Sequence, residues 1–192
     1  EARYVDAFFE AMSGLTTTGS TVFSGLDTLP KGLLLWRGIL QWLGGIGIIV
    51  VAMVFLPELR VGGMQIFRTE SFDTFGKILP RATEIATRIS VIYVALTLIC
   101  ALCYLGAGMG AFDAIVHAMT TIATGGFANY DASFAAFDPA VSYVATLFML
   151  LAALPFVRFV QLSAGTARPM LRDTQIHAFL ATALVIVFLI AG

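Results

Sequence analysis

Two short tracts of threonine and glycine are the residues of this chain best suited to chemistry. The first reads Thr16-Thr17-Thr18-Gly19 and the second Ala123-Thr124-Gly125-Gly126. Glycine adopts backbone conformations that other residues avoid, so successive carbonyl oxygens in such a tract can face the same way. A ring of backbone carbonyls can replace the hydration shell of an alkali cation, and threonine hydroxyls can add oxygen ligands or tie the loop down. The ordinary alternative is a glycine-containing turn between two helices.

The two tracts belong to an internal repeat, which is the first pattern to seek in a sequence. Sliding the chain by 107 residues gives 6 identities over the 16 positions from Val5 to Ser20. The identical pairs are Asp6 with Asp113, Ala7 with Ala114, Ala11 with Ala118, Met12 with Met119, Thr17 with Thr124 and Gly19 with Gly126. Each copy is a short apolar segment that ends in its tract and is followed by a long apolar segment. The repetition favours two equivalent cation-facing loops over an incidental turn.

The composition indicates an all-α integral membrane protein. The chain is 59% hydrophobic and 12% charged, with a mean hydropathy of +0.92, whereas soluble domains carry about 25% charged residues. Four runs contain no Asp, Glu, Lys or Arg, and each is near the roughly 20 residues that cross a hydrocarbon core. These runs are Gly38–Pro57, Ile89–Phe112, Pro139–Val157 and Thr174–Gly192. A net charge of −1 without a basic block gives no sign of a nucleic-acid partner, and the surrounding partner is membrane lipid.

The elements that position the tracts alternate between half-length and full-length helices. A helix over Tyr4–Leu15, with Asp6 as a cap or first-turn acid, spans about half a bilayer. The turn after it returns the chain to the side it entered, and the helix carboxyl end favours a cation at mid-membrane. The remaining expected elements are a crossing over Gly32–Leu56, a polar linker over Pro57–Arg88, a crossing over Ile89–Leu105, a second half-helix over Asp113–Ile122, a crossing over Ala140–Val160 interrupted at Pro155 and Arg158, and a further crossing from Thr174.

The charges predict which side each loop occupies. The links after the full crossings, together with Arg158, hold 8 of the 11 Lys and Arg residues, so they are expected to be cytoplasmic. The half-helices and their returns are then external, with seven acids against three bases, a field that attracts cations. The bases are Arg3, Lys31 and Arg37, and the acids are Glu1, Asp6, Glu10, Asp27, Asp113, Asp131 and Asp138. Asp6, Glu10, Asp27, Asp113 and Asp131 are expected to form an external acidic mouth, although each acid taken singly can be an ordinary solvated loop residue.

The first full crossing carries two further signals. Trp36 and Trp42 suit the membrane interface, with Arg37 near that boundary. Gly44, Gly45 and Gly47 are interpreted as sites of close helix packing rather than as a hinge.

Other candidate chemistry is weaker. Cys100 and Cys103 form a lone Cys-x-x-Cys on an expected membrane helix, for which packing is favoured over metal or redox work. Ser13 together with His117 suggests an intramembrane serine hydrolase as an alternative. The repeat argues against an enzyme, because Thr120 replaces Ser13 and Glu10 replaces His117 in the other copy. His117 is then a helix-packing or mouth residue, and His177 is interfacial. A non-conducting membrane scaffold is the other alternative.

Three stretches carry a resemblance to a known family. They are Ala11-Met-Ser-Gly-Leu-Thr-Thr-Thr-Gly-Ser20, Leu29-Pro-Lys-Gly-Leu-Leu-Leu-Trp-Arg37 and Gln41-Trp-Leu-Gly-Gly-Ile-Gly-Ile-Ile49. Together they resemble the first pore loop and following helix of the Trk/Ktr/HKT-type potassium-uptake family, in its TrkH-like membrane subunits. Met119–Phe127 resembles the second pore loop of the same family, and the resemblance covers essentially the whole chain.

The resemblance implies a potassium-channel-like fold of four helix–pore loop–helix repeats with pseudo-fourfold symmetry in the complete chain. It implies that backbone carbonyls of Thr16 to Gly19 and of Ala123 to Gly126 each form one quarter of a potassium filter. The expected parts are repeat 1 over 1–56 without its first helix, a cytoplasmic linker over 57–83, repeat 2 over 84–163, a cytoplasmic link over 164–173 and the start of repeat 3 over 174–192. The third-repeat gating loop and the last two quarters are expected to lie beyond this fragment.

The resemblance also implies the setting. The protein is expected to be multi-pass in the cytoplasmic (inner) membrane, with its pore loops facing outside. It is expected to take up K⁺ without a covalent cofactor, either as a channel or by proton- or sodium-coupled symport. The complete chain is expected to form a homodimer and to bind a cytosolic nucleotide-binding regulatory subunit. Two departures stand out. The stretch Leu154-Pro-Phe-Val-Arg-Phe-Val-Gln161 does not match the glycine-rich helix ending of many members, which leaves open whether Arg158 lines the cytoplasmic mouth. The two filters also differ at Thr18 against Gly125 and at Ser20 against Phe127, an asymmetry predicted to weaken discrimination between K⁺ and Na⁺.

Overall fold

The computed structural model describes residues 3–55 and 78–191. All regular structure in these two ranges is helical. The chain divides into two compact units, Glu1–Ala153 and Leu154–Gly192, which are described separately. Of the expected linker over 57–83, residues 57–77 lie outside the described residues.

The first short helix has the bounds that the sequence predicted. Helix α1 spans Tyr4–Leu15, and Asp6 in its first turn accepts a hydrogen bond from the Arg3 backbone N–H at 3.2 Å. The 3₁₀ turn η1 covers Leu26–Thr28, and α2 then spans Lys31–Phe55.

After a preceding long helix, the second part of the unit has the same order of elements as the first: a short helix, a 3₁₀ turn and a further helix. Helix α4 spans Ile78–Gly106, α5 Ala111–Ile122, the 3₁₀ turn η2 Ser133–Ala136 and α6 Pro139–Ala152. Helix α4 begins before the predicted Ile89, so the final part of the expected polar linker is helical. An ion pair between Glu84 and Arg88 at 2.8 Å, four residues apart, supports this exposed helical turn.

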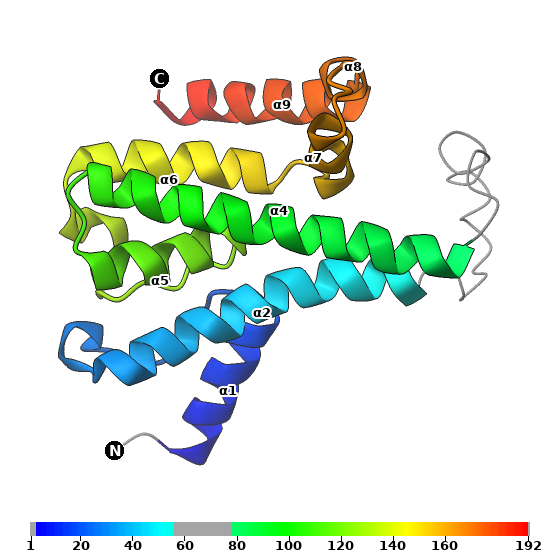
Figure 1. Ribbon diagram of the computed structural model, residues 1–192. Helices are drawn as coiled ribbons and strands as arrows, with labels where there is room; N and C mark the ends of the chain where they lie inside the picture. The colour runs from blue at the N-terminus through cyan, green and yellow to red at the C-terminus, as the bar shows by residue number, and fades with distance from the viewer. Residues whose placement is uncertain (1–2, 56–77, 192) are drawn as a thin grey trace. The chain divides into compact units, whose positions relative to one another are not determined.

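The helices of the first unit pack around the loops that follow α1 and α5. Helix α2 contacts α1, α4 and α5, and α4 also contacts α5 and α6 (Figure 1). Close approach depends on glycine. A Cβ at Gly44 would overlap the Leu15 carbonyl oxygen, and one at Gly45 would lie 3.0 Å from the Ala123 Cα. The close packing predicted for these two glycines is confirmed, whereas Gly47 meets no described atom within 4 Å.

The two tryptophans of α2 have different surroundings. Trp36 is exposed on the protein surface, which is compatible with a place at the membrane interface. Trp42 instead packs between helices, with its Nε1–H donating to Thr97 Oγ1 at 3.0 Å and its ring centroid 5.6 Å from that of Tyr93. The expectation of an interfacial Trp42 is therefore replaced by a role in α2–α4 packing, because Thr97 satisfies the indole donor away from water.

Membrane-spanning capacity is clearest for α4. Its segment Ala86–Gly106 is long and apolar enough to cross a bilayer, and α6 passes the same test when taken together with α7 (Phe156–Ser163). Pro155 breaks the helix between α6 and α7, as predicted. Arg158 lies within α7 and does not itself break the helix.

The second unit contains α7, the short α8 (Arg168–Leu171) and α9 (Thr174–Ala191). Arg158 Nε donates to Asp173 Oδ2 at 2.7 Å, and Arg158 Nη1 donates to Gln161 Oε1 at 3.0 Å. Burial acts to raise the pKa of Asp173, but hydrogen bonds from the Gln175 backbone and from Arg158 outweigh it and hold that pKa below its usual value. Arg158 therefore has carboxylate and amide partners within its own unit.

Candidate functional site

The two Thr/Gly tracts have the same backbone conformation. Thr17 and Thr124 have φ of 55° and 53°, and Gly19 and Gly126 have φ of 78° and 82°. The order in each tract is thus a left-handed residue, a residue without positive φ, and a second left-handed residue. Alternation of this kind turns successive peptide planes so that N–H groups gather on one side and carbonyls on the other.

The two hydrogen bonds at 2.9 Å that end α1 have counterparts at the end of α5, and in the first copy the Gly19 N–H also donates to the Ser13 carbonyl at 3.5 Å. In both copies the left-handed threonine and the residue after it donate back to the last helical turn, as in a Schellman motif. The donor and acceptor pairs are Thr17 to Gly14 at 2.9 Å, Thr18 to Ser13 at 2.9 Å, Thr124 to Thr121 at 3.0 Å and Gly125 to Thr120 at 2.9 Å. The repeat seen in the sequence is therefore a repeat of backbone geometry.

A threonine in the left-handed region is unusual. Glycine normally occupies this position after a helix, and positive φ in a β-branched residue is a genuine outlier. Strain of this kind persists where the surrounding structure over-determines it and gathers at functional sites. Its presence at both Thr17 and Thr124 marks the two loops as candidate sites.

The threonine hydroxyls bind the loops themselves. Thr16 Oγ1 donates to the Met12 carbonyl at 2.7 Å and lies 2.8 Å from Thr18 Oγ1. Thr124 Oγ1 donates to the Ala123 carbonyl at 2.7 Å. Of the two uses predicted for these hydroxyls, tying the loop down is the one seen.

The two loops lie directly against each other although they are far apart in the chain. A Cβ at Gly19 would overlap the Gly125 carbonyl oxygen, and one at Gly125 would collide with the side chain of Gln41. Both glycines are therefore required by close approach, and the backbone of the second loop touches that of the first at Gly19.

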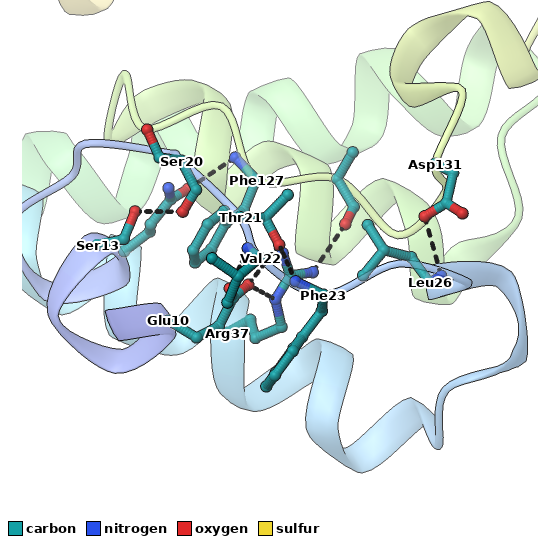
Figure 2. Close-up of polar contacts among 12 residues, drawn as sticks. Glu10, Ser13, Ser20, Thr21, Val22, Phe23, Leu26, Arg37, Phe127 and Asp131 are labelled. Carbon is teal, nitrogen blue, oxygen red and sulfur yellow. Dashed lines mark hydrogen bonds and ion pairs between the residues drawn. The ribbon is translucent and has the colours of Figure 1, made fainter. Parts of the chain in front are cut away.

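A buried ion pair stands behind the first loop. The Glu10 and Arg37 side chains are 4% and 3% exposed, and Arg37 Nε donates to Glu10 Oε1 at 2.8 Å. The Glu10 carboxylate also accepts from Thr21 Oγ1 at 2.8 Å and from the Val22 N–H at 3.1 Å (Figure 2). The pair fixes the chain that leaves the first loop.

The same α2 helix reaches the second loop. Arg37 Nη1 donates to the Ala128 carbonyl at 3.0 Å, and its guanidinium carbon lies 4.2 Å from the centroid of the Phe127 ring. Gln41 Oε1 accepts from the Phe127 N–H at 3.1 Å.

Comparison with known proteins places this geometry in a family. The model of the family described as "TrkH: Cation transport protein" matches residues 1–189. The chain belongs to the TrkH family.

Its relatives in the TrkH family are similar over nearly the whole chain. It is 48% identical over 184 residues to the Trk system potassium uptake protein TrkI of Halomonas elongata, covering 95% of this chain and 37% of that protein. It is 45% identical over 186 residues to the Trk system potassium uptake protein TrkH of Salmonella typhimurium, covering 95% of this chain and 38% of that protein. The chain thus spans less than two fifths of the length of these relatives.

A solved member of the family has the same fold. The crystal structure of the potassium transporter TrkH from Vibrio parahaemolyticus superposes with a TM-score of 0.83 at 41% identity, covering 99% of this chain and 38% of that one. The predicted membership and the all-helical fold are confirmed by these matches.

The five predicted mouth acids have different surroundings. Glu10 is buried against Arg37, and Asp6 accepts from Arg3 Nε at 3.1 Å, which lowers the pKa of Asp6. The other three are placed as follows: Asp113 accepts from Asn129 and Tyr130 at 2.8 and 3.1 Å, Asp131 accepts from the Gly25 and Leu26 N–H groups at 2.7 and 3.0 Å, and Asp27 is exposed in η1. Most of these carboxylates thus hold loops in place as well as carrying charge.

The residues of the hydrolase alternative have separate partners. Ser13 Oγ donates to the Ser20 carbonyl at 2.5 Å, and His117 Nδ1 lies 2.8 Å from the Asp113 carbonyl oxygen. Since the family consists of cation transport proteins, nothing here favours an enzyme. Cys100 is buried and Cys103 exposed, both as free thiols, and the described residues contain no cluster of three or more His, Cys, Asp or Glu able to hold a metal.

Sequence reasoning missed the supports behind the loops. It assigned Arg37 to the membrane boundary and gave Gln41 no role. The available signal was polar side chains within an apolar helix, four residues apart and so on one face of α2.

Proposed function

We propose that this chain supplies two quarters of a potassium pathway through the cytoplasmic membrane. Backbone oxygens of Thr16, Thr17, Thr18 and Gly19 in the first loop, and of Ala123, Thr124, Gly125 and Gly126 in the second, replace part of the hydration shell of K⁺. Oxygen–ion distances of about 2.8 Å are expected, a few tenths longer than those to Ca²⁺. No side-chain chemistry and no covalent cofactor take part.

The observation that carries the proposal is the matched pair of left-handed residues in each loop. A single strained loop has many explanations, but two copies with the same φ pattern and the same pair of Schellman hydrogen bonds support two equivalent parts of one site. The contact of the Gly125 carbonyl with the position of a Gly19 side chain supports a common site, because it puts the two loops side by side. The relatives named for potassium uptake support K⁺ as the ion.

Electrostatics around the loops suits a cation. Helices α1 and α5 both end immediately before a loop, so the partial negative charge of each helix end falls where the ion would sit. Glu10 and Arg37 neutralise each other. Of the seven external acids and three external bases, six acids and two bases then remain. Asp6, Asp27, Asp113 and Asp131 remain as the proposed external mouth.

The setting follows from the same proposal. The loops face the outside, the links at 57–83 and 164–173 face the cytoplasm, and the complete chain forms a dimer that binds a cytosolic nucleotide-binding subunit. The ion gradient or the membrane potential drives passage, through an open pore or by symport with protons or sodium.

Ion uptake by the reconstituted full-length protein tests the proposal. Purified protein in liposomes should take up K⁺ and Rb⁺ but not choline, and its unfolding temperature in detergent should rise with K⁺ because the ion binds only the folded state. Absence of both K⁺-dependent stabilisation and uptake would reject a K⁺ site at these loops.

A further inference from the structure

The residues that directly follow the two Thr/Gly tracts are anchored by hydrogen bonds from different parts of the chain. In the first loop the carbonyl of Ser20 accepts from Ser13 Oγ at 2.5 Å, a residue of the helix that precedes the loop. Phe127 occupies the equivalent position in the second loop, and its N–H donates to Gln41 Oε1 at 3.1 Å. The first loop is therefore anchored by its own repeat, whereas the second is anchored by the neighbouring one.

Two side chains on one face of α2 make this second anchor. Gln41 binds the N–H of Phe127, and Arg37, four residues earlier, donates to the carbonyl of Ala128 at 3.0 Å and lies over the Phe127 ring. Together they hold both ends of the Phe127–Ala128 backbone. Since Arg37 also pairs with Glu10, the same face of α2 fixes the exits of both loops.

Gln41 lies between the two loops. It is fully buried, and its amide lies 2.5 Å (Oε1) and 2.7 Å (Nε2) from the position of a Cβ at Gly125. Its Nε2 is also 3.6 Å from the Cβ position of Gly19 and has no hydrogen-bond partner among the described residues. The unpaired Nε2 is unfavourable, whereas Oε1 supplies the acceptor of the buried Phe127 N–H, so the side chain is kept for the backbone of the second loop.

We propose that Gln41, assisted by Arg37, is a positioning residue for ion selectivity: from the first repeat it sets the carbonyl geometry of the second loop without touching the ion. This inference rests on the proposed function. Phe127 directly follows Gly126, where φ is +82° and a Cβ would meet no described atom. The Phe127 N–H is the hydrogen-bonding group nearest to Gly126, so its release loosens the peptide on that side and the adjoining carbonyls lose part of their fixed direction, while Arg37 still holds the Ala128 carbonyl.

The test compares Gln41→Met with wild type in the full-length reconstituted protein. Methionine matches the length of glutamine but offers no comparable acceptor. We expect the K⁺/Na⁺ permeability ratio from reversal potentials to fall about tenfold, the scale set by one lost hydrogen bond. Gln175→Met is the matched control, because the exposed Gln175 side chain undergoes the same chemical change on α9. A permeability ratio is independent of how many molecules fold.

Amide hydrogen exchange supplies a second readout. In Gln41→Met, exchange at Phe127 and Ala128 should accelerate while exchange at Thr18 and Gly19 stays at the wild-type rate. An unchanged permeability ratio in folded protein, or equal acceleration in both loops, would overturn the inference.

A second variant covers the case in which Gln41→Met does not fold. An amide-to-ester change at Phe127 removes the donor N–H and keeps every side chain, but it also weakens the Gly126 carbonyl as a ligand, so the ratio should fall at least as far as in Gln41→Met. An ester variant with the wild-type ratio overturns the inference. If wild-type protein shows neither K⁺ uptake nor K⁺-dependent stabilisation, the proposed function fails instead, and the exchange rates still report whether Gln41 positions the second loop.

Discussion

Thr17 and Thr124, 107 residues apart in the chain, share the same left-handed backbone, with φ of 55° and 53°. Each follows the last turn of a short helix and returns its N–H to that helix. Glycine would adopt this conformation without strain, so the retention of threonine at both positions needs a reason. The proposed reason is rigidity: a strained residue held in one conformation fixes the carbonyls beside it.

Replacing Thr124 by glycine tests that reason. Thr124→Gly relieves about 1–2 kcal/mol of strain but adds freedom to the unfolded chain, so the unfolding free energy should stay within about 1 kcal/mol of wild type. Selectivity for K⁺ over Na⁺ should nevertheless fall, because the loop gains conformations. Thermal unfolding and cation uptake measure the two effects.

Ser133→Gly is the matched control for Thr124→Gly. Ser133 is also exposed and non-glycine, with φ of 51°, but it begins η2 outside both loops. It should show the same small change in stability and wild-type selectivity. If both variants had the same K⁺/Na⁺ selectivity, the strained backbone at Thr124 would have no role in selectivity.

Alanine at three left-handed glycines separates strain from steric overlap. Gly19, Gly126 and Gly165 have φ of 78°, 82° and 84°. A Cβ would meet no described atom at Gly126 or Gly165, but at Gly19 it would overlap the Gly125 carbonyl. Gly126→Ala and Gly165→Ala should each cost about 1–2 kcal/mol, and Gly19→Ala should cost more.

Transport distinguishes the same three variants. Gly19→Ala should abolish K⁺ uptake because the Gly125 carbonyl must move, and Gly126→Ala should reduce uptake. Gly165→Ala should keep the uptake rate per folded molecule. If Gly19→Ala transported K⁺ at the wild-type rate, these carbonyls would not form the ion's path.

Local patterns in the sequence predicted the helices and loops well. The bounds of α1, Tyr4–Leu15, and the positions of both loops followed from hydropathy and the repeat. The buried pair did not, because Glu10 and Arg37 are 27 residues apart and meet only after α1 packs on α2. The count of external charges included both residues, but their opposite charges cancel and do not change the net charge of the external side.

The sequence marks Arg37 and Gln41 as polar residues on one face of an apolar helix, but it does not reveal what they bind in the second loop. Gln41 reads as one polar residue in an apolar run, and its partner Phe127 contributes a backbone N–H that no side-chain pattern reveals. The helical start of α4 at Ile78 was missed because charged residues there indicated a linker.

The Glu10–Arg37 pair should dominate the stability of the first unit. Removing one partner leaves a buried charge, so Glu10→Gln or Arg37→Gln should each cost about 3–5 kcal/mol. The double variant should cost less than the sum, as expected for groups in contact. Asp6→Asn, which breaks the exposed pair with Arg3, is the control and should leave the melting temperature unchanged. Additive losses in the double variant would show that the two residues act independently.

Asp131 distinguishes a structural tie from a source of charge at the mouth. Its two carboxylate oxygens accept the N–H groups of Gly25 and Leu26, joining the return of the second repeat to η1 of the first. Figure 2 shows the bond to Leu26. Asp131→Asn should accelerate exchange of both amides by about tenfold or more, since charge-assisted hydrogen bonds are stronger than neutral ones. Asp138→Asn removes an equal charge but weakens only the cap on Ala140, so exchange at Gly25 and Leu26 should not change. If Asp131 acts through its charge alone, both variants will lower K⁺ uptake equally at low ionic strength, with wild-type exchange in η1.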